Sequence, residues 1–97
     1  MYIYVIGTES IQKIGFSKNP QSRLKQLQTG NSEQLFLHHM IEVSDERTRL
    51  LERFLHKDLS YKKLKGEWFK LSKQEAIDYL TFAEITWLND PLLEFKV

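Results

Sequence analysis

The chain contains no cysteine, and it has no hydrophobic run long enough to cross a membrane. Without cysteine the protein has no disulfide framework, no thiolate metal site and no thiol nucleophile, which fits a reducing compartment. The apolar residues 1–7 are too few for a signal sequence or a membrane span, and no basic segment precedes them. We therefore expect a soluble, intracellular protein that has no membrane partner.

The chain also lacks a strong excess of charge. Fourteen lysine and arginine residues against thirteen acidic residues give a formal net charge of +1, whereas proteins that coat duplex DNA are strongly basic. Positive charge is nevertheless concentrated in residues 56–70, which include Lys62, Lys63 and Lys65. This segment is either a solvated lysine loop or a patch that binds nucleic-acid phosphates.

The sequence shows no repeat, low-complexity segment or linker, and its 97 residues predict a single domain over residues 1–97. A domain of this size buries one hydrophobic core. Residues 2–6 and 11–16 are rich in β-branched and aromatic side chains, and a turn segment at residues 7–10 separates them. These segments predict a β-hairpin.

The first helix is expected over residues 20–29. Ser17 and Asn19 are both good N-caps, Pro20 suits the first helical turn, and Gly30 ends the pattern.

A third strand is expected over residues 33–43. Its apolar residues fall on both phases of the strand, so at least part of it is covered on both sides. Ser44 is expected to cap a second helix over residues 46–59. Helical spacing predicts that this helix buries Leu50, Leu51, Phe54 and Leu55.

Residues 67–71 predict a short strand or an extended segment. A capping box, Ser72-Lys73-Gln74-Glu75, begins a third helix that we expect to run to about residue 88, before the apolar tail at residues 92–97. The order β-β-α-β-α-(β)-α predicts an α+β fold, in which helices flank a small antiparallel three-stranded sheet.

Three polar residues of the first hairpin and the first helix are not required by a core, namely Tyr4, Lys13 and Arg23. Each has an ordinary structural explanation: a strand tyrosine packed for its ring, an exposed hairpin lysine, or a surface arginine of a helix.

Glu52 and His56 are four residues apart and therefore share one face of the second helix. A carboxylate beside the buried stripe of a helix needs a positive partner, which is Arg49, His56 or a metal ion. A zinc site needs three or four ligands, and no other histidine spacing in the sequence supplies them. A largely hydrated Mg²⁺ on a single carboxylate fits the sequence more easily.

The order of these residues resembles the GIY-YIG nuclease superfamily. The segments "YIYVI", "KIG" and "GEWF", together with Arg23 and Glu52 on successive helices, carry the resemblance over residues 2–71. The sequence is most similar to the phage-type branch in which KIG replaces YIG. The C-terminal helix and tail, residues 72–97, lie outside the motifs.

The resemblance implies an endonuclease that hydrolyses DNA with Mg²⁺ or Mn²⁺ as its cofactor. It implies that Tyr4 acts as, or positions, the general base, and that Lys13 takes the place of a second tyrosine. It further implies that Arg23 contacts the phosphate and that Glu52 binds the metal. Lys13 would then stabilise the phenolate of Tyr4.

The sequence departs from the family pattern at three positions. Phe16 and Leu27 occur where many relatives carry a histidine, and Glu67 occurs where many carry an asparagine. His56 and a metal-bound water are the alternatives for the proton transfer that such a histidine would perform.

Three interpretations of the function remain open. The first is a metal-dependent endonuclease, and the second is a nucleic-acid-binding or interaction module on the same scaffold. The third is an unrelated small α+β binding protein. The first places the protein in the cytoplasm of a bacterium or a phage-infected host, and a homodimer is compatible with it.

Overall fold

The computed structural model of the chain describes residues 1–86. Four strands form one antiparallel sheet in the order β3-β1-β2-β4. The strands are β1 (Tyr2–Gly7), β2 (Gln12–Ser17), β3 (Phe36–Glu42) and β4 (Trp68–Phe69). The helices are α1 (Pro20–Thr29), α2 (Asp45–Asp58), α3 (Lys73–Thr86) and the short 3₁₀ helix η1 (Ser60–Lys62).

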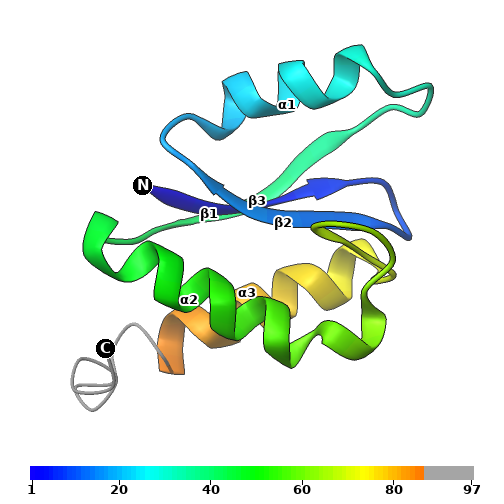
Figure 1. Cartoon of the computed structure of the whole chain (residues 1–97). Helices are drawn as coiled ribbons and strands as arrows, with labels where there is room; N and C mark the ends of the chain where they lie inside the picture. Colours follow the sequence, from blue (N-terminus) through cyan, green and yellow to red (C-terminus); the bar gives the residue numbers. More distant parts are fainter. Residues whose placement is uncertain (87–97) are drawn as a thin grey trace.

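Helix α1 covers one face of the sheet, and α2 and α3 cover the other (Figure 1). The predicted α+β fold and its order of elements are confirmed. The uncertain segment 67–71 supplies a fourth strand of only two residues, β4, which pairs with β2 at the edge of the sheet.

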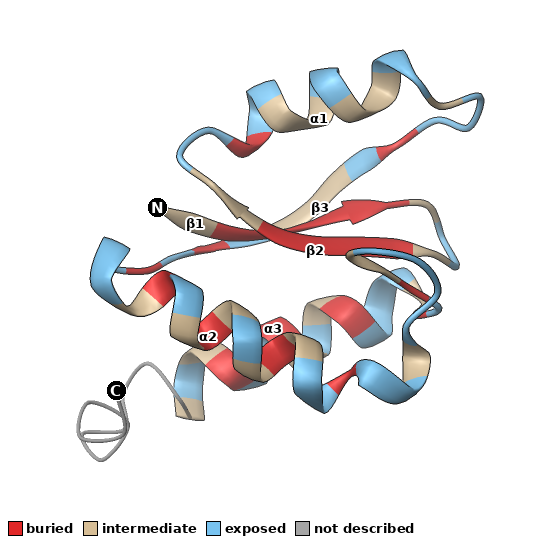
Figure 2. Ribbon diagram, in the orientation of Figure 1, coloured by how far each residue is buried: buried red, intermediate tan, exposed pale blue. Residues whose placement is uncertain are grey.

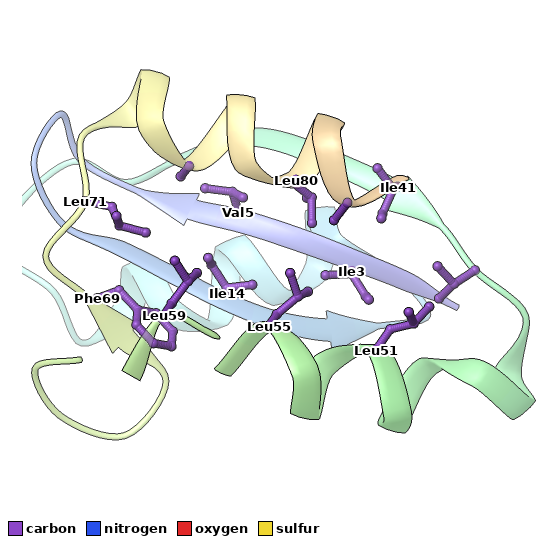
Figure 3. Packing of buried hydrophobic residues seen from close by; sticks show 13 residues of the cluster. Ile3, Val5, Ile14, Ile41, Leu51, Leu55, Leu59, Phe69, Leu71 and Leu80 are labelled. Atoms are coloured by element: carbon purple, nitrogen blue, oxygen red, sulfur yellow. The ribbon is translucent and has the colours of Figure 1, made fainter. Parts of the chain in front are cut away.

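The main core lies between the sheet and helices α2 and α3 (Figure 3). Ile3 and Val5 of β1 and Ile14 of β2 point into it, and Leu55 of α2 and Leu80 of α3 meet them. Of the four side chains expected to be buried on α2, Leu51 and Leu55 are buried, whereas Leu50 and Phe54 pack partly buried against the cluster.

A smaller core lies on the opposite face, between the sheet and α1. Tyr4, Ile6 and Leu35 are buried there, and Leu24 and Leu27 of α1 pack against them half-buried. Much of the surface of α1 is exposed (Figure 2), whereas the central strand β1 is buried on both faces. One face of the sheet therefore carries most of the apolar packing.

Two of the three predicted helix caps are formed as expected. The Asn19 side chain accepts a hydrogen bond from the Ser22 N–H at 3.2 Å, which caps α1. In the predicted capping box, the Ser72 hydroxyl accepts from the Glu75 N–H and the Glu75 carboxylate accepts from the Ser72 N–H, each at 3.0 Å.

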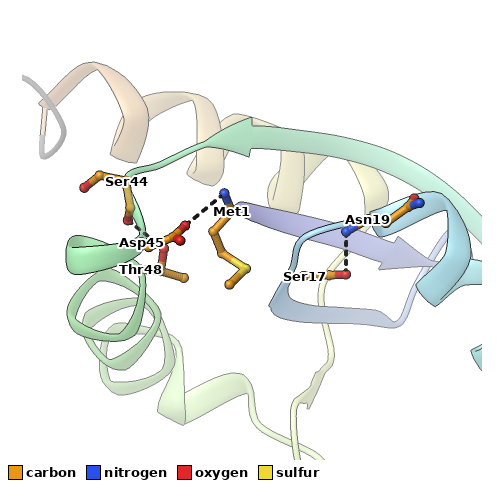
Figure 4. A network of polar contacts seen from close by, with 6 residues as sticks. All are labelled: Met1, Ser17, Asn19, Ser44, Asp45 and Thr48. Atoms are coloured by element: carbon orange, nitrogen blue, oxygen red, sulfur yellow. Dashed lines mark hydrogen bonds and ion pairs between the residues drawn. The ribbon is translucent and has the colours of Figure 1, made fainter.

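The expected cap at Ser44 differs. Ser44 occupies the N-cap position of α2, but its side chain makes no capping hydrogen bond. Its carbonyl instead accepts from the Thr48 hydroxyl at 2.8 Å, and the amino group of Met1 lies 3.3 Å from the Asp45 carboxylate (Figure 4). A carboxylate in the first turn also stabilises the helix through its dipole.

Strand β3 begins at Phe36, three residues later than the sequence predicted. The cause is Gln28 at the end of α1. Its amide donates to the Glu33 carbonyl at 2.8 Å and accepts from the Leu35 N–H at 2.7 Å. Because this side chain satisfies the backbone of the loop, the segment before Phe36 does not need a strand partner.

A bulge explains the apolar residues on both phases of β3. Val5 pairs with His39 and Ile6 with Leu37, so His38 is the extra residue between two paired positions. Leu37 therefore packs on the α1 face, whereas Ile41, four residues later, belongs to the main core.

The expected end of the third helix near residue 88 and the tail at residues 92–97 lie outside the described residues. Within residues 1–86, no helix combines the length and the hydropathy that a membrane span requires.

Leu55→Ala should lower the free energy of unfolding by about 2–5 kcal/mol, because it leaves a cavity in the main core. Leu64→Ala is the matched control, since it makes the same change at a side chain that is 51% exposed, and it should cost less than about 0.5 kcal/mol. Urea denaturation followed by circular dichroism measures both losses. Equal losses would contradict the placement of Leu55 in the core.

Hydrogen bonds from Ser72, first from its N–H and then from its hydroxyl, lower the pKa of Glu75 below its usual 4.5. A lowered folded-state pKa stabilises the fold above the unfolded pKa, and the effect is lost as the pH falls through the folded value. Glu75→Gln keeps a capping side chain but removes the charge. The stability advantage of the wild type should therefore be present at about pH 6 and shrink toward about pH 3. Thermal melts across this range test it, and an advantage that is independent of pH would refute it.

Candidate active site

The candidate site begins where the pairing between β2 and β4 stops. These strands pair at Gln12 and Lys13 only. At the next position the Ile14 N–H donates to the Glu67 carbonyl at 3.2 Å, as continued pairing would require. The Ile14 carbonyl, however, is bound at 2.8 Å by Nε2 of His56 from α2.

Gly66 turns the chain at this point. Its φ angle is 59°, in the left-handed region that favours glycine. The turn comes one residue before Glu67 and is closed by a hydrogen bond from the Trp68 N–H to the Lys65 carbonyl at 3.0 Å. The Glu67 side chain consequently lies at the open edge of β2, close to α2.

Tyr4 and Arg23 meet on the α1 face of the sheet. Tyr4 is the pairing partner of Gly15, and its ring lies over that glycine. A Cβ atom at Gly15 would be 2.8 Å from the Tyr4 hydroxyl and 2.7 Å from Oε2 of Glu67. Arg23 of α1 lies close enough to the Tyr4 hydroxyl to lower its pKa. The missing side chain of Gly15 thus lets the phenol and the carboxylate approach each other.

Glu52, His56 and Glu67 form a compact group at the same edge. One ligand atom of each residue lies within 4.8 Å of those of the other two, and all three side chains are half-buried. Although Glu52 belongs to a helix on the opposite face from α1, its charge is close enough to act on the pKa of Tyr4. The two faces of the sheet therefore contribute to one site.

Lys13 joins the site through Glu67. Its ammonium lies 3.8 Å from Oε2 of Glu67 and 5.7 Å from the centroid of the Trp68 ring, and the residue is only 8% exposed. The sequence suggested that Lys13 would stabilise a phenolate at Tyr4. Arg23 is the cation that lowers the pKa of Tyr4, whereas the Lys13 ammonium, on the same face of the sheet, lies beside the Glu67 carboxylate.

Burial raises the pKa of the Tyr4 hydroxyl above its usual 10, and the hydrogen bond and charge of Arg23 oppose this only in part. Tyr4 is therefore a neutral phenol at neutral pH. Burial also raises the pKa of Glu52, and the negative charge of Glu67 adds to the effect, while His56 and Lys13 oppose it. Both shifts have the direction expected for groups withdrawn from water.

Two arginines line a hollow with Glu52: Arg49, which the sequence analysis named only as a possible partner of Glu52, and Arg53, which it did not name. A hollow of about 280 Å³ is lined by Phe16, Arg49, Glu52, Arg53 and His56. The four polar residues follow the spacing i, i+3, i+4, i+7, which places them on one face of α2. This polar stripe was the sequence pattern that could have identified Arg49 and Arg53.

Glu67 is the other residue that the sequence analysis left out of the site. It was noted only as a departure from asparagine, because its role depends on the contact with Ile14, which is far away in the sequence. The predicted basic patch precedes it. Lys63 and Lys65 are exposed, whereas the Lys62 ammonium lies 5.7 Å from the Tyr61 ring centroid and near enough to lower the pKa of Glu75.

The sheet order and the helices on both faces are consistent with a GIY-YIG-like fold. The T5orf172 domain matches residues 1–84, and the chain therefore belongs to this domain family. The T5orf172 domain is a GIY-YIG/HNH-like domain associated with phage endonucleases, which connects the chain with nucleases and nucleic acids. No curated protein and no solved structure matches the chain.

Gly15→Ala tests the close approach within the site. The new methyl group would collide with the Tyr4 ring, which is buried and cannot move freely. We expect a loss of about 1–3 kcal/mol in the free energy of unfolding, as for other overpacked sites. Gly30→Ala is the control, because nothing lies within 4 Å of a Cβ there. Chemical denaturation compares the two variants, and an equally stable Gly15→Ala protein would argue against the contact.

Proposed function

We propose that this protein is an endonuclease that hydrolyses DNA phosphodiester bonds with the help of a divalent metal ion. One observation carries the proposal: the Tyr4 phenol, on whose pKa Arg23 acts, meets the Glu67 carboxylate over Gly15, and Glu67 in turn lies within 4.8 Å of Glu52. Membership of the T5orf172 domain family supports the same class of activity.

The donor set fits Mg²⁺ or Mn²⁺. Carboxylate oxygens are ligands that both ions prefer, and Glu52 is half-buried at the edge of an open hollow. Glu52 would hold the ion, as the resemblance to GIY-YIG nucleases implies. A bound divalent ion supplies charge stabilisation for a phosphate oxygen and for the leaving oxygen.

Arg23 has the geometry to bind the scissile phosphate. Its guanidinium carries five donors in a planar fork, and those not used by Gln26 would be left for two non-bridging oxygens. A phosphate bound there would lie beside the Tyr4 hydroxyl. The scissile phosphate would thereby lie at the open edge of β2, near Glu52.

Tyr4 positions the attacking water in this proposal. Because its pKa is raised, the hydroxyl is neutral at neutral pH and acts through hydrogen bonds rather than as a standing phenolate. The charge of Arg23 acts on the hydroxyl, and burial of Tyr4 to 1% exposure fixes the position of its ring. Such fixed alignment of a nucleophile is a large part of enzymatic rate enhancement.

Lys13 and the arginines of α2 extend the positive charge around the site. Lys13 balances Glu67, while Arg49 and Arg53 flank the hollow beside Glu52. Neighbouring phosphates of a polynucleotide would find these arginines, and the exposed Lys63 and Lys65, on either side of the reacting group. These contacts are made to the sugar–phosphate backbone of the nucleic acid and therefore carry no sequence specificity.

Cleavage of supercoiled, linear and single-stranded DNA should require Mg²⁺ or Mn²⁺ and should stop with EDTA. Arg23→Ala removes a preorganised donor, so it should slow nicking by about 10²–10³-fold. Glu52→Gln should also abolish most of the activity, because the amide is a poor ligand for a hard cation. Gel assays of nicked and linear products measure the rates.

The matched controls are Lys25→Ala on α1 and Glu46→Gln on α2, which alter exposed side chains and should leave cleavage unchanged. If the folded protein retards DNA in gels but cleaves none of the substrates, and Glu52→Gln binds equally well, then the protein is a nucleic-acid-binding module. Absence of both binding and cleavage would exclude both functions.

A further inference from the structure

The group of three potential metal ligands at the candidate site contains a histidine as well as two carboxylates. Glu52, His56 and Glu67 each bring a ligand atom within 4.8 Å of the others. The sequence alone argued against a zinc site, because no other histidine spacing added ligands to Glu52 and His56. Glu67 supplies the third ligand from a distant part of the chain.

The ring of His56 is held in one orientation. Nε2 lies 2.8 Å from the Ile14 carbonyl, and since a carbonyl oxygen can only accept, Nε2 carries the proton. The ring also meets Phe69 edge-on, with centroids 5.0 Å apart. Nδ1 is therefore the ring nitrogen that is left for a ligand. A backbone carbonyl that binds the far nitrogen is the usual partner of a metal-ligating histidine.

The main chain of Glu67 is anchored to the same residue. The Ile14 N–H donates to the Glu67 carbonyl at 3.2 Å, while the Ile14 carbonyl holds His56. Ile14 is fully buried in the main core. Two of the three ligand residues are thus fixed by one peptide segment that cannot move without disturbing the core, which is the preorganisation that a metal site needs.

We propose that Glu52, Glu67 and Nδ1 of His56 form a three-ligand site for a first-row transition cation such as Zn²⁺ or Mn²⁺. An imidazole nitrogen favours such cations, whereas Mg²⁺ prefers oxygen ligands and retains its water. Three protein ligands leave coordination positions open, as in catalytic rather than structural zinc sites. The catalytic meaning of the site rests on the proposed nuclease function, but metal binding does not.

Isothermal titration calorimetry of the wild-type protein with Zn²⁺, Mn²⁺ and Mg²⁺ should show tighter binding of the two transition cations. His56→Gln keeps an N–H donor for the Ile14 carbonyl but removes the ligand. It should weaken Zn²⁺ binding by at least about tenfold and leave Mg²⁺ binding nearly unchanged. Glu67→Gln should weaken the binding of Zn²⁺ and Mn²⁺.

His38→Gln is the matched control, because Nε2 of His38 also binds a backbone carbonyl, that of Thr8, at 2.9 Å. It should not change Zn²⁺ affinity. In ¹⁵N NMR spectra of the unmutated protein, the Nδ1 signal of His56 should move on addition of Zn²⁺, while that of His38 should not. The spectra test the ligand without a substitution, so a variant that fails to fold does not decide the result.

An unmoved His56 signal at saturating Zn²⁺, or unchanged Zn²⁺ affinity in folded His56→Gln and Glu67→Gln proteins, would overturn the inference. Full DNA cleavage with Mg²⁺ in that case would leave the nuclease proposal intact. Conversely, Zn²⁺ binding through His56 without any DNA cleavage would support the proposed metal site and contradict the proposed nuclease function. The two proposals therefore fail in distinguishable ways.

Discussion

The two hydrogen-bonding groups of Ile14 that point away from β1 hold the candidate site together. In an ordinary antiparallel pair both groups would bind the opposite residue of the neighbouring strand. Here the N–H binds the Glu67 carbonyl as expected, but the carbonyl binds the His56 ring from a helix. This exchange is possible because β4 is two residues long and the chain turns at Gly66. The site therefore lies where the pairing of β2 with β4 ends, because the Ile14 carbonyl is left there for the His56 ring.

Gly15 joins the two faces of the sheet at that edge. Tyr4 and Arg23 belong to the thinly packed α1 face, while Glu52 and His56 come from a helix that packs on the main core. A side chain at Gly15 would separate the Tyr4 phenol from the Glu67 carboxylate, since its Cβ would occupy the space between them. The apolar packing that stabilises the fold lies mostly on the other face, so polar groups can gather here at limited cost to the core.

Local signals in the sequence were sufficient for most of the fold. The capping box at Ser72 and Glu75 involves residues three apart, and it forms as predicted. The start of β3 was misplaced because Gln28, outside the strand, binds the backbone that precedes it. Glu67 was not assigned to the site for the same kind of reason, since its position follows from a contact with Ile14. Sequence patterns report neighbours along the chain, whereas these two features depend on partners brought together by folding.

The distribution of charge within the site has no explanation in packing alone. Two half-buried carboxylates, Glu52 and Glu67, lie close together, although burial and mutual repulsion both raise the free energy of the charged forms. Lys13, itself nearly buried, pairs with Glu67, and the charge of Arg23 acts on Tyr4 on the same face of the sheet. The site thus has a cationic side suited to a phosphate and an anionic side suited to a metal ion. Solubility alone does not explain why the cationic side and the anionic side lie so close together. Each side is built from charged groups that separate elements of the fold withdraw from water.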